Sequence, residues 1–81
     1  MQVKVYITPK QGVLDPQGRA IEQSLKSLGF DNVARVRMGK YIVLDVAAGS
    51  PAEAGGEVKR ICEQLLANTV IEDYRFEVEG A

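Results

Sequence analysis

Three groups of side chains in this sequence are of types that could do chemistry: a lone cysteine, a cationic turn and a set of carboxylates. Cys62 could act as a nucleophile, but a thiol needs a neighbouring base or cation to ionise it, and the chain contains no histidine. Cys62 also falls on the apolar side of an expected helix, where a buried structural thiol is the common outcome. We therefore expect an inert thiol and no catalytic residue in this chain.

The cationic turn is the sequence Arg37-Met38-Gly39-Lys40, in which two cations flank a glycine. These cations could meet a carboxylate or phosphate of a partner, or they could be ordinary solvated charges, and the sequence leaves both interpretations open. Glycine-rich phosphate loops of the GxxxxGK[ST] or GxGxxG type do not occur. The carboxylates form no recognisable metal-ligand pattern, because those at helix starts already have a capping role, so we predict no metal. They are Asp15, Glu53, Glu57, Glu72 and Asp73.

The stretch GVLDPQG at residues 12–18 connects the first expected strand to the first expected helix. Asp15 followed by Pro16 predicts a helix that begins at Pro16, because the carboxylate accepts backbone N–H groups of the first turn and proline fits the first helical position. Gly18 costs up to roughly 1 kcal/mol relative to alanine inside a helix. Its presence indicates close approach by another group, although an ordinary loop whose glycines relieve local sterics explains the same pattern.

Composition restricts the possible classes of function. Eighty-one residues make one small domain, residues 1–81, and a net charge of -1 gives no basic footprint for nucleic acid. No apolar run approaches the roughly 18 residues of a membrane span, and no signal peptide precedes the first strand, so we expect a cytoplasmic chain without membrane contact. One cysteine excludes an internal disulfide.

Hydrophobic periodicity predicts the elements that position these residues. Alternation predicts a strand over residues 2–8, and the stripe Ile21, Leu25 and Leu28 predicts a helix that ends at Gly29. Two strand-like segments follow, at 33–38 and 41–46. The Gly39-Lys40 pair between them is either a tight hairpin or a bend in one long strand.

The second half of the chain repeats the order of strand, capped helix and strand. Ser50-Pro51-Ala52-Glu53 is a capping box that starts a helix at Pro51, with a reciprocal bond expected from the Ser50 N–H to Glu53. We expect Asn68 to end this helix in the left-handed conformation. The expected buried residues are Val58, Ile61, Cys62 and Leu65 on the helix, and Tyr74, Phe76 and Val78 on one face of the final strand.

This order predicts an α+β fold of ferredoxin-like plan, β-α-β-β-α-β, or β-α-β-α-β if the middle strands are continuous. We expect an antiparallel sheet with two helices on one face. A small core and a second apolar face carried by Tyr41 and Val43 also predict a homodimer.

Three stretches together resemble the PurS family, the small subunits of phosphoribosylformylglycinamidine synthase. They are GVLDPQG at 12–18 continuing to Ala20-Ile21, VRMGK at 36–40 and LLANTVIEDY at 65–74. The resemblance covers the whole chain. It departs at Thr69, where the family usually has proline, which bears on the conformation of the Asn68-Thr69 turn.

The resemblance implies a role in the fourth step of de novo purine synthesis, in a complex that uses ATP and Mg. The small subunit is implied to be a non-catalytic dimeric bridge between an ATP-dependent synthetase subunit and a glutaminase subunit, which helps ammonia pass between them. No cofactor is expected on this chain itself. The residues that we expect to contact partners are Asp15, Gln17, Gly18, Arg37, Gly39, Lys40, Asn68 and Glu72.

Two other classes share the expected plan. A regulatory domain would bind a small effector between protomers. A small acylphosphatase-like enzyme would need an arginine in a phosphate-binding loop after the first strand, and this loop offers only Lys10. We rank both below the bridging subunit.

Overall fold

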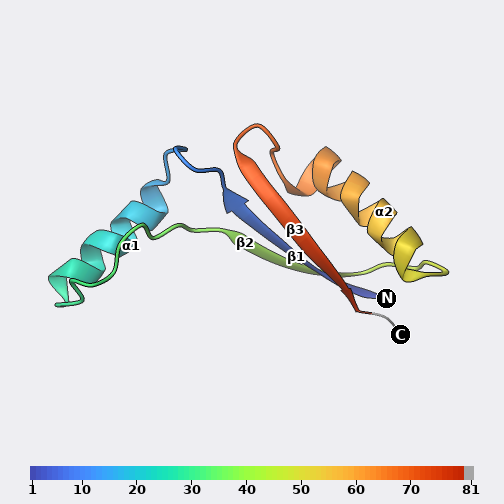
Figure 1. Cartoon of the computed structure of the whole chain (residues 1–81), viewed down its shortest axis with the longest axis horizontal. Coiled ribbons are helices and arrows are strands. Elements are labelled where there is room, and N and C mark those ends of the chain that lie inside the picture. Colours follow the sequence, from blue (N-terminus) through green and yellow to red (C-terminus); the bar gives the residue numbers. More distant parts are fainter. Residues whose placement is uncertain (80–81) are drawn as a thin grey trace.

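The computed structural model describes residues 1–79, and within them three strands alternate with two α-helices. Figure 1 shows their arrangement. The elements in chain order are β1 (Gln2–Pro9), α1 (Pro16–Ser27), β2 (Lys40–Asp45), α2 (Pro51–Ile61), a π-helical turn η1 (Cys62–Leu66) and β3 (Glu72–Glu79).

The three strands form one antiparallel sheet in the order β2-β1-β3. β1 is central, and its Val5 lies opposite Ile42 of β2 and Phe76 of β3. The α+β class and the ferredoxin-like plan are therefore confirmed, in the β-α-β-α-β form that the sequence left as an alternative.

The core lies between α2 and one face of the sheet. Alternate residues of β1 point into it and are almost completely buried, as are residues one helical turn apart on α2. The predicted inward face of β3 is also confirmed, because its three apolar residues pack against this core. The inward residues are Val3, Val5 and Ile7 of β1, Ala54 and Val58 of α2, Cys62 of η1, and Tyr74, Phe76 and Val78 of β3.

Both predicted helix starts are confirmed. Asp15 Oδ1 accepts a hydrogen bond from the Gly18 N–H at 3.0 Å, and Ser50 Oγ accepts one from the Glu53 N–H at 3.2 Å. The reciprocal bond of the capping box differs, because the Glu53 carboxylate accepts from the N–H of Gly49 at 3.0 Å and not from Ser50. Each helix thus has one side-chain cap for its first-turn donors.

The expectation of two helices on one face of the sheet is wrong for α1. Figure 1 shows α2 alongside the strands, whereas α1 continues beyond the end of the sheet. The apolar stripe of α1 therefore covers no core, and Ile21 and Leu28 are 40% and 71% exposed. The cause is local: α1 packs instead on the extended segment 33–38, where only Gly18 of this helix becomes buried.

The expected strand over 33–38 is also absent, since β2 begins only at Lys40. The N–H groups of Val36 and Met38 donate to the side chains of Glu22 and Asp15, at 3.2 and 2.8 Å, instead of to a neighbouring strand. Arg35 has a φ of 56°, which interrupts the extended backbone. Side chains of α1 and of its N-cap residue thus take the place of a strand partner.

The predicted end of the second helix is wrong in two respects. The π-helical turn adds a residue to the last turn, so that Leu66 packs against the core while Leu65 is 79% exposed. Asn68 does not adopt a positive φ. Its side chain instead accepts a hydrogen bond from the Val70 N–H at 3.2 Å, which makes a turn before β3.

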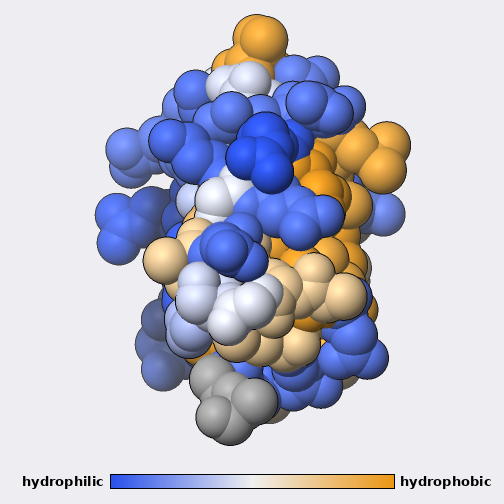
Figure 2. Space-filling model, turned by 90° about the vertical axis from the view of Figure 1, so that its right-hand side faces the viewer, coloured by the Kyte–Doolittle hydropathy of each residue, from blue (hydrophilic) through white to orange (hydrophobic). Residues whose placement is uncertain are grey.

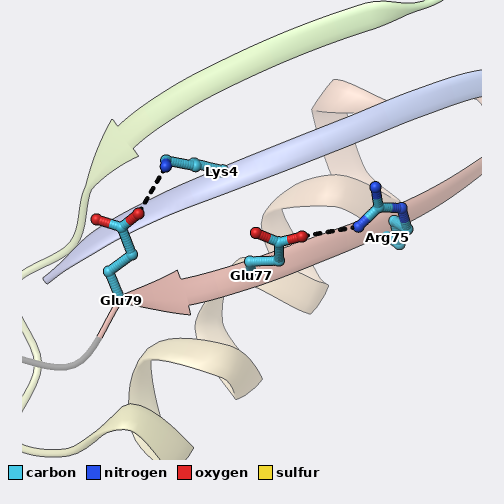
Figure 3. Close-up of polar contacts among 4 residues, drawn as sticks. All are labelled: Lys4, Arg75, Glu77 and Glu79. Carbon is cyan, nitrogen blue, oxygen red and sulfur yellow. Dashed lines mark hydrogen bonds and ion pairs between the residues drawn. The ribbon is translucent and has the colours of Figure 1, made fainter.

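The sheet face opposite α2 carries charged and aromatic side chains. Figure 3 shows Lys4 paired with Glu79 at 2.6 Å and Arg75 paired with Glu77 at 2.9 Å on this face. Arg75 also lies 4.0 Å from the ring centroid of Tyr6. This face is therefore solvated and polar, apart from Tyr41 and Val43 of β2, which are exposed as expected.

Exposed apolar side chains are numerous for so small a chain. Seen from the α2 end, the surface has a band of apolar atoms beside a mainly hydrophilic face (Figure 2). Over residues 1–79, no helix has both the length and the apolar composition needed to cross a membrane. The exposed large apolar residues are Leu14, Ile21, Leu28, Phe30, Met38, Tyr41, Val43, Leu65, Val70 and Ile71.

Candidate partner-binding site

Two groups of the expected contact residues lie where β1 ends. The first joins β2 to β3: Lys40 Nζ lies 3.7 Å from Glu72 Oε2, and Glu72 Oε1 accepts a hydrogen bond from the Asn68 N–H at 2.8 Å. Glu72 is the register partner of Pro9, the last residue of β1. The structure thus brings Lys40 next to Asn68 and Glu72, although Lys40 lies about thirty residues earlier in the chain.

The second group surrounds the carboxylate of Asp15. This carboxylate accepts hydrogen bonds from the backbone N–H groups of Gly18, at 3.0 Å, and of Met38, at 2.8 Å. These two bonds, together with the positive charge of Arg37, lower the pKa of Asp15 below its usual range. Arg37 Nη1 also donates to the carbonyl of Pro9 at 3.1 Å, so this group too adjoins the end of β1.

The chain's own backbone accounts for both glycines of the expected site. A Cβ atom on Gly18 would lie 2.4 Å from the Val36 carbonyl oxygen, and one on Gly39 would lie 2.4 Å from the carbonyl oxygen of Ile7. Real Cβ atoms do not approach so closely, so both positions require glycine. The close approach inferred at Gly18 is therefore internal to this chain. Gln17, beside it, is exposed in the first turn of α1.

Glu22 is a structurally important carboxylate that was not among the expected contact residues. It accepts a hydrogen bond from the Val36 N–H, and this bond, helped by the charge of Lys26, lowers the pKa of Glu22. A usable signal existed, because Asp15 and Glu22 are seven residues apart and so lie on one side of a helix. Together they hold segment 36–38 against α1.

Cys62 lies in the core with 0% exposure. Burial, and secondarily the negative charge of Glu63, raises the pKa of its thiol. Both effects oppose formation of the nucleophilic thiolate.

Within residues 1–79, no three carboxylate or cysteine side chains lie close enough together to hold a metal ion. The geometry supports contact with a partner better than it supports catalysis.

Comparison with known proteins gives one consistent result. Residues 2–80 match the family model PurS, described as phosphoribosylformylglycinamidine (FGAM) synthase. The PurS subunit of phosphoribosylformylglycinamidine synthase from Bacillus subtilis is 51% identical over 78 residues, which cover 96% of this chain and 92% of that subunit. A crystal structure of B. subtilis PurS superposes with a TM-score of 0.84 and covers 96% of both chains.

Two further solved structures agree. PurS of Methanocaldococcus jannaschii, a subunit of formylglycinamide ribonucleotide amidotransferase in the purine biosynthetic pathway, is 41% identical with a TM-score of 0.83 and covers 96% of this chain and 94% of that one. A chain of PurLQS from Thermotoga maritima is 35% identical with a TM-score of 0.81 and covers 95% of this chain and 96% of that one. The chain therefore belongs to the PurS family of phosphoribosylformylglycinamidine synthase subunits.

Proposed function

We propose that this chain is a non-catalytic, homodimeric bridge that holds the synthetase and glutaminase subunits of phosphoribosylformylglycinamidine synthase together and helps ammonia pass between them. The synthetase subunit uses ATP, the complex requires Mg, and it works in the cytoplasm. The T. maritima neighbour supports the multi-subunit part of this proposal, because it is a chain of PurLQS.

The surface of the chain is the observation that carries the proposal. The chain exposes 5799 Å². A compact monomer of 8.8 kDa exposes about 4,800 Å². The difference of about 1,000 Å² is close to the roughly 800 Å² that each partner buries in a stable interface. The elongated shape, 50 × 26 × 14 Å, and the uncovered stripe of α1 account for this excess.

A bridging role also agrees with the chemistry of the side chains. The chain has no histidine, and its single thiol is buried with a raised pKa. Its polar residues at the end of β1 are occupied in hydrogen bonds and ion pairs that fix the shape of a surface. A rigid surface with exposed apolar side chains is suited to contact with other proteins.

Reconstitution with separately purified synthetase and glutaminase subunits tests the proposal. We expect glutamine-dependent turnover to require this chain, while turnover driven by external ammonia proceeds with the synthetase subunit alone. The chain by itself should hydrolyse neither glutamine nor ATP. Full glutamine-dependent turnover without this chain would contradict a bridging role.

A further inference from the structure

A groove of about 700 Å³ lies between the loop 10–15, the first half of α1 and the segment 34–37. None of its lining residues belongs to the core, and it lies on the side of α1 that packs on segment 34–37. Cations dominate the ionisable side chains that line it. These are Lys10, Arg19, Arg35 and Arg37, with the carboxylates Asp15 and Glu22.

Both carboxylates of the groove are already used within the chain. Asp15 and Glu22 accept hydrogen bonds from backbone N–H groups of segment 36–38, which keeps them ionised at neutral pH. Four cations against two carboxylates leave the groove with a charge of +2, in a chain whose net charge is -1. This charge is therefore concentrated locally and is not a consequence of overall composition.

The groove cations form no ion pairs within residues 1–79, whereas most of the other cations do. Within residues 1–79, every ion pair involves a lysine or arginine outside the groove, namely Lys4, Lys26, Lys40 or Arg75. Of the groove cations, Arg37 donates one hydrogen bond to the Pro9 carbonyl. The guanidinium groups of Arg19 and Arg35 form no ion pair with a carboxylate of the described residues.

Arg35 also has an unusual backbone conformation. Its φ of 56° lies in the left-handed region, which is unfavourable for residues that have a Cβ atom. Among residues 1–79, Arg35 is the one residue other than glycine with a positive φ. The hydrogen bond from the next residue, Val36, to Glu22 holds it there. The fold thus maintains a disfavoured conformation that places an exposed arginine at the groove, and such conformations cluster at functional sites.

We propose that this groove binds an acidic segment of a partner subunit, whose Asp or Glu side chains pair with Arg19 and Arg35 and whose apolar side chain packs on Leu14. This inference rests on the bridging role proposed above. Arginine recognises carboxylates through two parallel hydrogen bonds, and three of the four groove cations are arginines. Leu14 is 73% exposed beside them. Since the arginines are exposed, the groove suits an extended chain better than a small molecule, whose sites enclose most of the ligand.

The test measures association of the full chain with the synthetase and glutaminase subunits, singly and together, at low and high salt. Arg35→Gly removes the cation and also relieves the disfavoured backbone conformation, so it should fold at least as stably as the wild type yet bind at least 5-fold more weakly at low salt. Arg19→Glu should weaken binding further. Arg60→Glu, a charge reversal at an exposed arginine of α2 outside the groove, is the matched control and should leave affinity within 2-fold of the wild type.

The outcomes separate this inference from the proposed function. If the wild-type chain joins neither subunit, the bridging role fails. If the wild type assembles and the Arg35 and Arg19 variants assemble equally well with the same salt dependence, the groove assignment is overturned and the bridging role stands. Inorganic phosphate provides a further arm: a phosphate-dependent rise in melting temperature that Arg35→Gly abolishes, with assembly unchanged, would show a small-anion site and would also overturn the acidic-segment assignment.

Discussion

Asp15 and Met38, 23 residues apart in the chain, are joined by a hydrogen bond of 2.8 Å from the Met38 N–H to Asp15 Oδ2. The other oxygen of the same carboxylate caps the first turn of α1 through Gly18. One side chain therefore starts the helix and also holds the segment that leads into β2. The position of α1 relative to the sheet depends on this carboxylate together with that of Glu22, which accepts a hydrogen bond from the Val36 N–H of the same segment.

The first prediction concerns the pH dependence of this carboxylate. Because the pKa of Asp15 is lowered in the folded state, its stabilising effect is complete above the unfolded value of 3.8 and is lost as pH falls through the lower folded value. Asp15→Asn should therefore melt at a lower temperature than the wild type at pH 7, and the two should converge in acid. Calorimetry from neutral to acidic pH measures this difference. Asp73→Asn, at an exposed position of β3, is the control, and an Asp15→Asn difference that persists unchanged in acid would contradict the prediction.

A second prediction compares two helical glycines. Gly18→Ala should destabilise the chain by about 1–3 kcal/mol, because the new Cβ atom would meet the Val36 carbonyl oxygen and either the helix or segment 36–38 must shift. Gly56→Ala on α2 meets no atom within 4 Å and should stabilise the chain by up to about 1 kcal/mol. Urea unfolding of both variants gives the two values. Equal effects of the two substitutions would show that the close approach at Gly18 has no energetic consequence.

The sequence predicted most accurately where one local rule determines the structure. The starts at Pro16 and Pro51 follow from capping chemistry, and the inward faces of β1 and β3 follow from alternation. Segment 33–38 was predicted wrongly because its apolar residues fit a strand, while the backbone N–H groups of Val36 and Met38 donate to the carboxylates of Glu22 and Asp15 instead of to a neighbouring strand. Long-range pairing of this kind has no periodic signature in sequence.

The candidate site was predictable to a similar extent. Its residues were named from motifs in the sequence, but their grouping around the end of β1 depends on strand register, which the sequence left open. The roles of the glycines were also beyond prediction, because a glycine in a helix indicates close approach without showing what approaches. The π-helical turn shifted the buried position from Leu65 to Leu66, since periodicity assumes a regular helix.

The third prediction tests that shift. Leu66→Ala should cost about 2–3 kcal/mol of unfolding free energy, because Leu66 packs against the core. Leu65→Ala should change stability by less than about 0.5 kcal/mol in the isolated chain, because Leu65 is 79% exposed. Urea unfolding of both variants, at a protein concentration low enough to favour monomers, measures the two changes in stability. The reverse order of effects would indicate a regular α-helical register through residue 65.

The fourth prediction concerns the reactivity of Cys62. Its thiol is buried and its pKa is raised, so alkylation by iodoacetamide at pH 8 should be at least 100-fold slower in the native chain than in urea. Cys62→Ala should cost about 1 kcal/mol of stability for the lost packing and should leave glutamine-dependent turnover of the reconstituted complex nearly unchanged. Fast labelling of the folded chain, or a loss of turnover with assembly intact, would give the thiol a chemical role.

The last prediction concerns the apolar stripe of α1 in the proposed homodimer. This helix packs on none of the strands, and its Ile21 and Leu28 remain 40% and 71% exposed, so we expect a second copy to cover them in the homodimer. Leu28→Lys should raise the dimer dissociation constant at least 10-fold. A lysine is chosen because a cation near the C-terminus of a helix does not destabilise the helix itself.

Val70→Lys, at an 80% exposed apolar position in the turn before β3, is the matched control and should leave the dimer intact. Sedimentation equilibrium across micromolar concentrations measures both constants. A wild type that remains monomeric would refute the homodimer, whereas dissociation of the Val70 variant alone would move the interface from α1 to the turn before β3.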